Sequence, residues 1–113
     1  MKSLRVLVLL AMLGSSPKAF AVDFERADCN RDGGINLADA IYLLNYLYGG
    51  AATPLCLDAC DVNDDGVIDI ADPIFHLNFL KGPAPQLPPL PFNMCGADPT
   101  ADGLDCAEYP PCP

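Results

Sequence analysis

The chain of 113 residues carries fifteen Asp and Glu residues against six Lys and Arg, a net charge of −9 at pH 7. Such an acidic chain repels phosphate backbones and anionic lipid, which argues against nucleic acid and membrane surfaces as partners. Its length allows one small domain whose apolar core alone gives little stability, so disulfides or metal ions are expected to stabilise it.

Residues 1–21 have the layout of a secretory signal peptide. Lys2 and Arg5 precede an apolar run over residues 6–13, and small residues follow up to Ala21. The run is shorter than the roughly 20 apolar residues that span a membrane. We therefore expect cleavage after Ala21, secretion or display at the cell surface, and no membrane insertion after cleavage. Cleavage removes three basic residues and no acid, leaving a net charge of −12.

Two segments of the chain, 33 residues apart, are copies of one unit. Residues 28–50 and 61–83 are identical at twelve of 23 aligned positions. In each copy an acidic, turn-rich stretch leads into apolar residues at helical spacing. These are Ile41, Leu44 and Leu47 in the first copy and Ile74, Leu77 and Leu80 in the second. We expect each copy to bury this face on the other, so the predicted fold is a small all-α domain over residues 22–83, with two loop–helix repeats in pseudo-twofold arrangement.

Helix boundaries can be predicted from the residues that flank each apolar pattern. Asn36 and Asp69 are suited to be N-caps, and Gly49 and Gly82 are expected to end the two helices. Pro73 falls in the first turn of the second helix, where a missing N–H costs least.

Aromatic residues broaden the apolar pattern of both helices. At helical spacing such residues are more often core than a carbohydrate-binding platform, and only one of them is expected to be exposed. The residues expected in the core are Tyr42, Tyr46, Phe75 and Phe79, and the exposed exception is Tyr48. His76, the only histidine, is expected on the helix surface.

Each copy opens with the pattern D-x-N-x-D-G-x-I-[ND]-x-x-D, at residues 28–39 (loop 1) and 61–72 (loop 2). Ca²⁺ takes six to eight oxygen ligands, which alternate residues of a tight loop can supply. The expected ligands in loop 1 are the side chains of Asp28, Asn30, Asp32, Asn36 and Asp39 and the carbonyl of Gly34. Those in loop 2 are the side chains of Asp61, Asn63, Asp65, Asp69 and Asp72 and the carbonyl of Val67. Two copies in register favour two Ca²⁺ ions over ordinary solvated Asx turns.

The two loops differ in charge. Loop 1 offers three carboxylates and carries Arg31 between its ligands, whereas loop 2 offers four and has Asp64 at the same position. We therefore expect loop 2 to bind Ca²⁺ more tightly.

The tail, residues 84–113, is rich in proline and cysteine. Nine of the twelve prolines lie between Pro83 and Pro113, which excludes a regular helix or a central strand there. In an exported chain six cysteines indicate three disulfides. They are Cys29, Cys56 and Cys60 in the repeat region and Cys95, Cys106 and Cys112 in the tail. With three on each side, an odd number of bridges must join the two regions, and fifteen connectivities remain open.

Asp98, Thr100 and Asp102 begin another D-x-[ST]-x-D-G pattern within the tail. Cys106 and Tyr109 stand at positions 9 and 12 of this pattern, so the closing carboxylate is missing. We expect a disulfide-bounded turn, with a weak third ion site as the alternative.

The sequence offers no catalytic constellation. There is no serine after residue 16, the cysteines are expected to be oxidised, and the single His76 has no partner group. We therefore predict that the chain is not an enzyme.

The duplicated loops and helices over residues 24–83 resemble the dockerin family, in which Asp replaces the usual EF-hand Glu at loop position 12. The resemblance implies F-hand repeats without an entering helix, two Ca²⁺ ions held by the residues named above, and docking onto a cohesin domain, often to recruit enzymes of polysaccharide catabolism.

This chain departs from the best-known dockerins at the positions that recognise cohesin. Those dockerins carry Ser-Thr at loop positions 10 and 11 and basic residues at 17, 18 and 22. The corresponding residues here are Leu37, Ala38, Leu44, Asn45 and Gly49 in the first repeat and Ile70, Ala71, Leu77, Asn78 and Gly82 in the second. The alternative function is a structural or surface protein, stabilised by Ca²⁺ and disulfides, without a specific partner.

Overall fold

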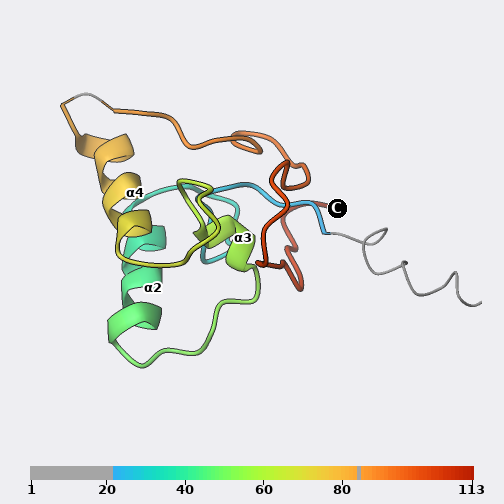
Figure 1. The fold of residues 1–113 in the computed structure, drawn as a ribbon, viewed down its shortest axis with the longest axis horizontal. Helices are drawn as coiled ribbons and strands as arrows, with labels where there is room; N and C mark the ends of the chain where they lie inside the picture. The colour runs from blue at the N-terminus through green and yellow to red at the C-terminus, as the bar shows by residue number, and fades with distance from the viewer. Residues whose placement is uncertain (1–21, 84) are drawn as a thin grey trace, which may run out of the picture.

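The computed structural model describes residues 22–83 and 85–113, so the predicted signal peptide lies outside the described residues. The helices are α2 (Leu37–Tyr48), the short α3 (Leu57–Cys60) and α4 (Ala71–Lys81). Figure 1 shows α2 and α4 side by side, with the tail returning from the end of α4 towards the side of α3. None of these helices has the length and apolar character needed to cross a bilayer. The small helical class is confirmed; strand pairing in the described residues is limited to isolated bridges.

The predicted N-caps lie at the starts of the two long helices. Asn36 Oδ1 accepts the N–H of Ala38 at 2.9 Å, and Asp39 accepts the N–H of Asn36 at 2.9 Å, which completes a capping box. Asp69 and Asp72 repeat both bonds at 3.0 Å, although α4 itself begins one residue later than this pattern implies, after Ile70.

Both long helices end at the predicted glycines. Gly49 and Gly82 each donate their N–H to a carbonyl four residues back, that of Asn45 or Asn78, at 2.8 Å. A Cβ on Gly82 would stand 2.6 Å from the Asn78 carbonyl oxygen, so only glycine fits this closure.

The three predicted disulfides form as Cys29–Cys60, Cys56–Cys106 and Cys95–Cys112. One of them joins the repeat region to the tail, which agrees with the predicted odd number. Around the joining bridge Ala107 donates its N–H to the Leu55 carbonyl at 2.7 Å, and Asp58 donates its N–H to the Asp105 carbonyl at 3.1 Å.

The core consists of two small clusters, each built around a disulfide. The first contains Phe24, Cys56, Ala59 and Tyr109, and therefore includes a residue of the tail. The second contains Cys29, Leu43 and Cys60, with Tyr42, Tyr46, Leu47 and Ile68 packed against it. A chain that buries so little apolar surface relies on its covalent bridges.

The predicted buried face of the long helices is wrong in part. Ile41 and Ile74 are 50% and 49% exposed, and Leu77 is 36% exposed. The row that turns inwards is instead short and partly polar, because it must also carry the last carboxylate of each loop. Its members are Asp39, Ala40 and Leu43 in α2 and Asp72, Pro73 and His76 in α4.

The predicted surface position of His76 is also wrong. Its ring is buried, with Nε2 2.9 Å from the carbonyl oxygen of Asn36, and it meets Phe79 edge to face. It thus occupies the place of Leu43 in the first repeat, and burial lowers its pKa. Tyr48 is exposed, as predicted, and the other helix aromatics are half-buried.

Candidate metal centres

The two acidic loops share an unusual backbone. Position 4 is left-handed in both, with φ of 60° at Arg31 and 56° at Asp64. Position 6 is also left-handed, with φ of 88° at Gly33 and 81° at Gly66, which favours glycine. This tight path turns alternate side chains towards the inside of each loop.

Three carboxylates converge in each loop, with oxygen atoms within 4.8 Å of one another. They are Asp28, Asp32 and Asp39 in loop 1 and Asp61, Asp65 and Asp72 in loop 2. In both loops positions 1 and 12 are buried and position 5 is exposed. Like charges at this spacing repel strongly unless a cation or protons neutralise them.

The carboxylates at position 1 are held by the loop backbone in the same way. Asp28 accepts the N–H of Gly33 at 2.9 Å, and Asp61 accepts that of Gly66 at 3.0 Å. These bonds fix the orientation of one oxygen.

The carboxylates at position 12 tie the two ends of each loop together. Asp39 accepts the N–H of Asn30 at 3.1 Å and that of Asn36 at 2.9 Å. Asp72 makes the corresponding bonds in loop 2 at 3.5 and 3.0 Å. A residue at the start of each long helix therefore organises the loop before it.

The middle positions also repeat. Asn30 Oδ1 accepts the N–H of Asp32 at 3.3 Å, and Asp32 Oδ1 accepts that of Gly34 at 2.9 Å. The equivalent bonds in loop 2 measure 3.2 and 3.0 Å and run between Asn63, Asp65 and Val67.

Position 9 is the exception among the predicted ligands. Asn36 and Asp69 direct a side-chain oxygen at the first N–H groups of α2 and α4, and Asp69 lies outside the group of three carboxylates in loop 2. This geometry suits contact with an ion through water.

Burial changes the acidity of the loop carboxyls. It raises the pKa of Asp39 and of Asp72 to about 7 and that of Asp61 to about 6, and neighbouring aspartates add to the effect. Such groups hold protons near neutral pH unless a cation takes their place.

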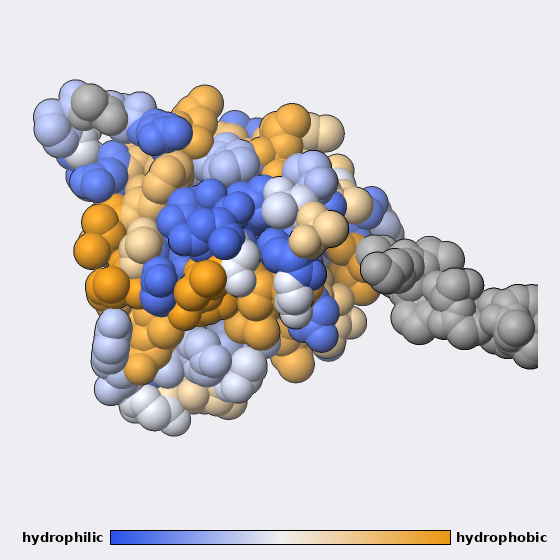
Figure 2. Space-filling model, viewed as in Figure 1, coloured by the Kyte–Doolittle hydropathy of each residue, from blue (hydrophilic) through white to orange (hydrophobic). Residues whose placement is uncertain are grey.

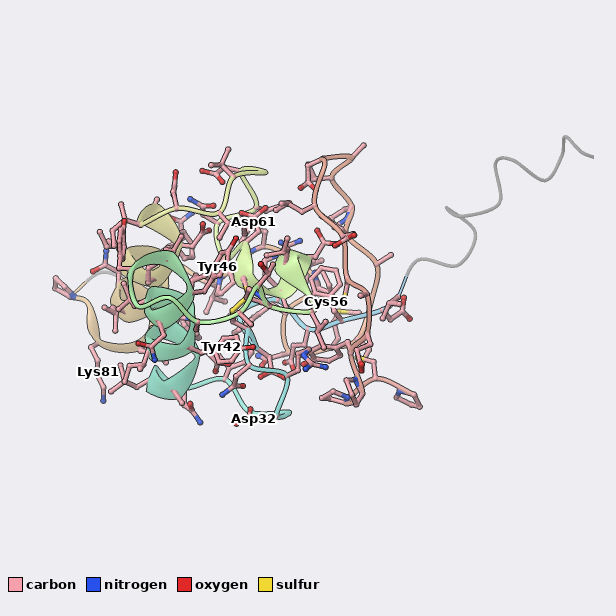
Figure 3. The ribbon with its side chains drawn as sticks, turned by 90° about the horizontal axis from the view of Figure 1, so that it is seen from below. Asp32, Tyr42, Tyr46, Cys56, Asp61 and Lys81 are labelled. Atoms are coloured by element: carbon pink, nitrogen blue, oxygen red, sulfur yellow. A yellow bond between two sulfur atoms is a disulfide. The ribbon has the colours of Figure 1, made fainter. Side chains whose placement is uncertain are left out.

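The tail contacts both loops, which the sequence did not predict. The Tyr109 hydroxyl donates to the carboxylate of Asp28 in loop 1. Thr100 Oγ1 donates to Asp64 in loop 2 at 2.6 Å, and Glu108 lies 3.7 Å from the guanidinium of Arg31. In Figure 3, Asp32 and Asp61 lie on opposite sides of Tyr42 and Tyr46, so the tail has to reach two separate places.

Arg26 is a second residue that sequence reasoning missed. It is fully buried and donates to the backbone carbonyls of Leu90 (3.0 Å) and Asp61 (2.9 Å) and to the carboxylate of Asp98 (3.1 Å). It therefore links loop 2 to the tail. The only signal in the sequence was its rarity, as one of three basic residues after residue 21.

Residues 26–75 match the family model of the dockerin type I domain. These residues are identified as a dockerin domain. The match covers loop 1, α2, α3, loop 2 and the first turn of α4. Dockerin domains bind calcium and act as protein-docking modules rather than catalytic domains, so calcium binding and docking follow from family membership. Comparison with curated proteins and with solved structures gave no match.

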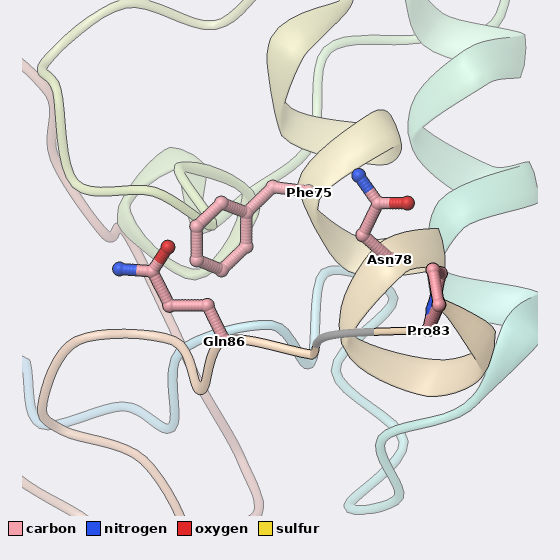
Figure 4. Close-up of a pocket in the computed structure, with 5 residues that line it drawn as sticks. Phe75, Asn78, Pro83 and Gln86 are labelled. Atoms are coloured by element: carbon pink, nitrogen blue, oxygen red, sulfur yellow. The ribbon is translucent and has the colours of Figure 1, made fainter.

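A hollow of about 290 Å³ at the end of α4 lies apart from the dockerin loops (Figure 4). Phe75, Asn78, Gly82, Pro83 and Gln86 line it. These five residues include no acid, base or nucleophile, so they offer no group for proton transfer or covalent catalysis.

Proposed function

We propose that each loop of this dockerin domain binds one Ca²⁺ ion, so that the two repeats together hold two. Three observations support this: the ligand set is all oxygen, the carboxylates of each loop converge, and the same hydrogen bonds recur in both loops. Ca²⁺ suits a flexible oxygen cage better than Mg²⁺, which requires octahedral geometry and keeps its waters.

The ligands of loop 1 in this proposal are the side chains of Asp28, Asn30, Asp32 and Asp39, the carbonyl of Gly34, and Asn36 through water. Those of loop 2 are Asn63, Asp61, Asp65 and Asp72, the carbonyl of Val67, and Asp69 through water. Since position 12 begins each long helix, ion binding couples loop closure to helix formation. The two repeats are then related by an approximate twofold axis between α2 and α4.

The function that we propose for the domain is Ca²⁺-dependent docking onto a cohesin-type partner, through the outward faces of α2 and α4. The observation that carries it is a row of exposed apolar side chains, in which two positions of the first repeat are matched by their equivalents in the second. Its members are Leu37 and Ile41 in the first repeat and Ile70, Ile74 and Leu77 in the second. Figure 2 shows hydrophobic residues gathered along the edge of the molecule formed by these helices. A protein of this size gains nothing from exposing such a row unless a partner covers it.

The row also indicates what the partner looks like. Leu37 and Ile70 stand where the best-known dockerins have Ser, so the hydrogen bonds of that serine are replaced by apolar contact. We therefore propose a cohesin-type partner whose matching surface is apolar. The three disulfides support a secreted or cell-surface protein, and a role in polysaccharide catabolism would come through the partner.

The test is capture from the secreted and envelope fractions and from a panel of purified cohesin domains, with Ca²⁺ and with EDTA. We expect a cohesin-type protein to be retained with Ca²⁺ and lost in EDTA. The Ile41→Asp/Ile74→Asp double variant should weaken retention at least tenfold, because it places a charge in the centre of each apolar row.

The control is Leu87→Asp, which charges an even more exposed apolar residue of the tail (64% exposed) and should leave retention unchanged. Equal loss in the control and the double variant, or no retained partner at all, would favour a structural protein without a specific partner.

A further inference from the structure

A third group of carboxylates lies outside the two dockerin loops, where the tail meets α3. Asp58 of α3 and Asp98 and Asp102 of the tail bring oxygen atoms within 4.8 Å of one another. They line one side of a hollow of about 330 Å³, which has room for water molecules as well.

Asp58 is what distinguishes this group from an ordinary acidic surface. It is only 8% exposed, and its Oδ1 has no hydrogen-bond partner among the described residues. One oxygen each of Asp98 and Asp102 is likewise buried without a partner. Buried carboxylate oxygens without donors are costly, and such atoms in a native fold indicate an ion or a water that completes the site.

The protein's own cations do not satisfy this group. Arg26 reaches one oxygen of Asp98 at 3.1 Å and lies 3.6 Å from Asp64, and its other donors go to backbone carbonyls. Arg26 thus pairs with two of the carboxylates gathered here, those of Asp64 and Asp98, and makes no ion pair with Asp58 or Asp102. The negative charge that remains uncompensated is large enough to attract a divalent cation.

We propose that Asp58, Asp98 and Asp102 bind a third Ca²⁺ ion. The tail supplies the first half of a calcium loop, D-x-T-x-D-G, but lacks the carboxylate at position 12. Asp58 supplies that carboxylate from a different part of the chain. The ligands are all oxygen and include neither His nor thiolate, which favours Ca²⁺ over zinc.

The neighbouring covalent structure positions Asp58 for this role. The Cys56–Cys106 disulfide lies two residues before it, and its own N–H donates to the Asp105 carbonyl at 3.1 Å. The third site is therefore assembled only when the tail is joined to α3.

Calcium titration of the purified, oxidised chain by calorimetry tests the proposal. We expect three equivalents in the unmodified chain and two in Asp58→Asn, which keeps the shape of the side chain and removes its charge. The control Asp23→Asn alters an exposed carboxylate that does not line this hollow and should keep three. Two equivalents in the unmodified chain, or three in Asp58→Asn, would overturn the third site.

Melting temperatures give a second reading that does not depend on counting ions. In EDTA, Asp58→Asn should melt at a higher temperature than the unmodified chain, because like-charge repulsion is relieved. The rise in melting temperature on adding Ca²⁺ should be smaller for Asp58→Asn than for the unmodified chain. A lower melting temperature in EDTA and an undiminished Ca²⁺ gain would contradict the proposal, and Asp102→Asn repeats the test if Asp58→Asn fails to fold. The docking helices α2 and α4 lie elsewhere, so partner capture does not depend on the third site. The third-site proposal and the docking proposal can therefore fail separately.

Discussion

Arg26 is a fully buried cation in a strongly acidic molecule, and its donors are shared between loop 2 and the tail. Replacing it with Met removes all of these bonds and leaves carbonyl and carboxylate oxygens buried without donors. We expect Arg26→Met to lower the free energy of unfolding by about 3–5 kcal/mol. Urea denaturation in saturating Ca²⁺ measures this value. Arg31→Met is the control, because its pair with Glu108 is partly exposed and is worth about 1 kcal/mol or less.

Tyr109 acts on loop 1 from the far end of the chain. Its buried hydroxyl donates to Asp28, and burial together with that carboxylate keeps its pKa well above the usual range, so it remains a donor. We expect Tyr109→Phe to weaken Ca²⁺ binding in loop 1 about tenfold, as loss of a group that orients a metal ligand does. Calorimetry measures the Ca²⁺ affinity, and Tyr48→Phe, at an exposed tyrosine, is the reference variant. Unchanged affinity in Tyr109→Phe would show that the contact has no bearing on the ion.

At the residue scale, the sequence predicted those structural and site residues that lie close together in the chain. The caps and the closing glycines follow local spacing and lie where they were expected, and three carboxylates converge in each loop. Their role as calcium ligands stays a prediction. The roles of Arg26, Asp58 and Tyr109 depend on contacts across 30 to 80 residues, which no spacing rule contains. His76 was misplaced for the same reason, because its burial is set by Asn36 in the other repeat.

The loops should respond to pH in opposite directions with and without Ca²⁺. Burial raises the pKa of Asp39 and Asp72 to about 7 and of Asp61 to about 6. Without Ca²⁺, these protonated groups stabilise the fold below about pH 4, and that stability is lost as the pH rises through 6 to 7. With Ca²⁺, binding needs the ionised form. We therefore expect the melting temperature to fall between pH 5 and 8 in EDTA and to rise over the same range in Ca²⁺. A rise in both conditions would be inconsistent with these pKa directions.

That loop 2 binds Ca²⁺ more tightly than loop 1 stays a prediction, and the structure makes the expected difference in affinity smaller. Asp69 contacts the start of α4 instead of the carboxylate group, and both position-4 residues have counter-charges in the described structure. We still expect loop 2 to bind more tightly, by roughly threefold to tenfold, because its formal charge is more negative. Matched variants Asp39→Asn and Asp72→Asn each disable one loop, and calorimetry compares the loops that remain. Tighter binding in Asp72→Asn than in Asp39→Asn would reverse the order.

At the scale of the helices, the presence and the ends of α2 and α4 were predictable, whereas the face that each helix buries was not. Asn36 caps the start of α2 and Gly49 caps its end, as expected, because capping depends on residues close together in the chain. The choice of buried face was not local. The position-12 aspartates must point into the loops, and this rotates Ile41 and Ile74 outwards to the surface proposed for docking. The four-residue α3 carries no periodic pattern and is held by its disulfides.

For the whole molecule, the tail is the unexpected part of the architecture. It is joined to α3 by Cys56–Cys106, and it contacts both loops through Thr100 and Tyr109. The dockerin match ends before the tail begins, so the predicted boundary at residue 83 divides segments that pack together. We expect reduction of the disulfides to destabilise the folded chain by several kcal/mol, since the three bridges close loops of 31, 50 and 17 residues.

The central claim is that calcium holds this undersized dockerin fold together. Its most direct test is the far-ultraviolet circular dichroism of the oxidised chain at pH 8, followed while Ca²⁺ is added to EDTA-treated protein. We predict that part of the helical signal is lost without Ca²⁺ and returns as the loops fill, and that Asp39→Asn/Asp72→Asn fails to recover it at the same concentration. The same helical signal and melting temperature in EDTA as in Ca²⁺ would contradict the account.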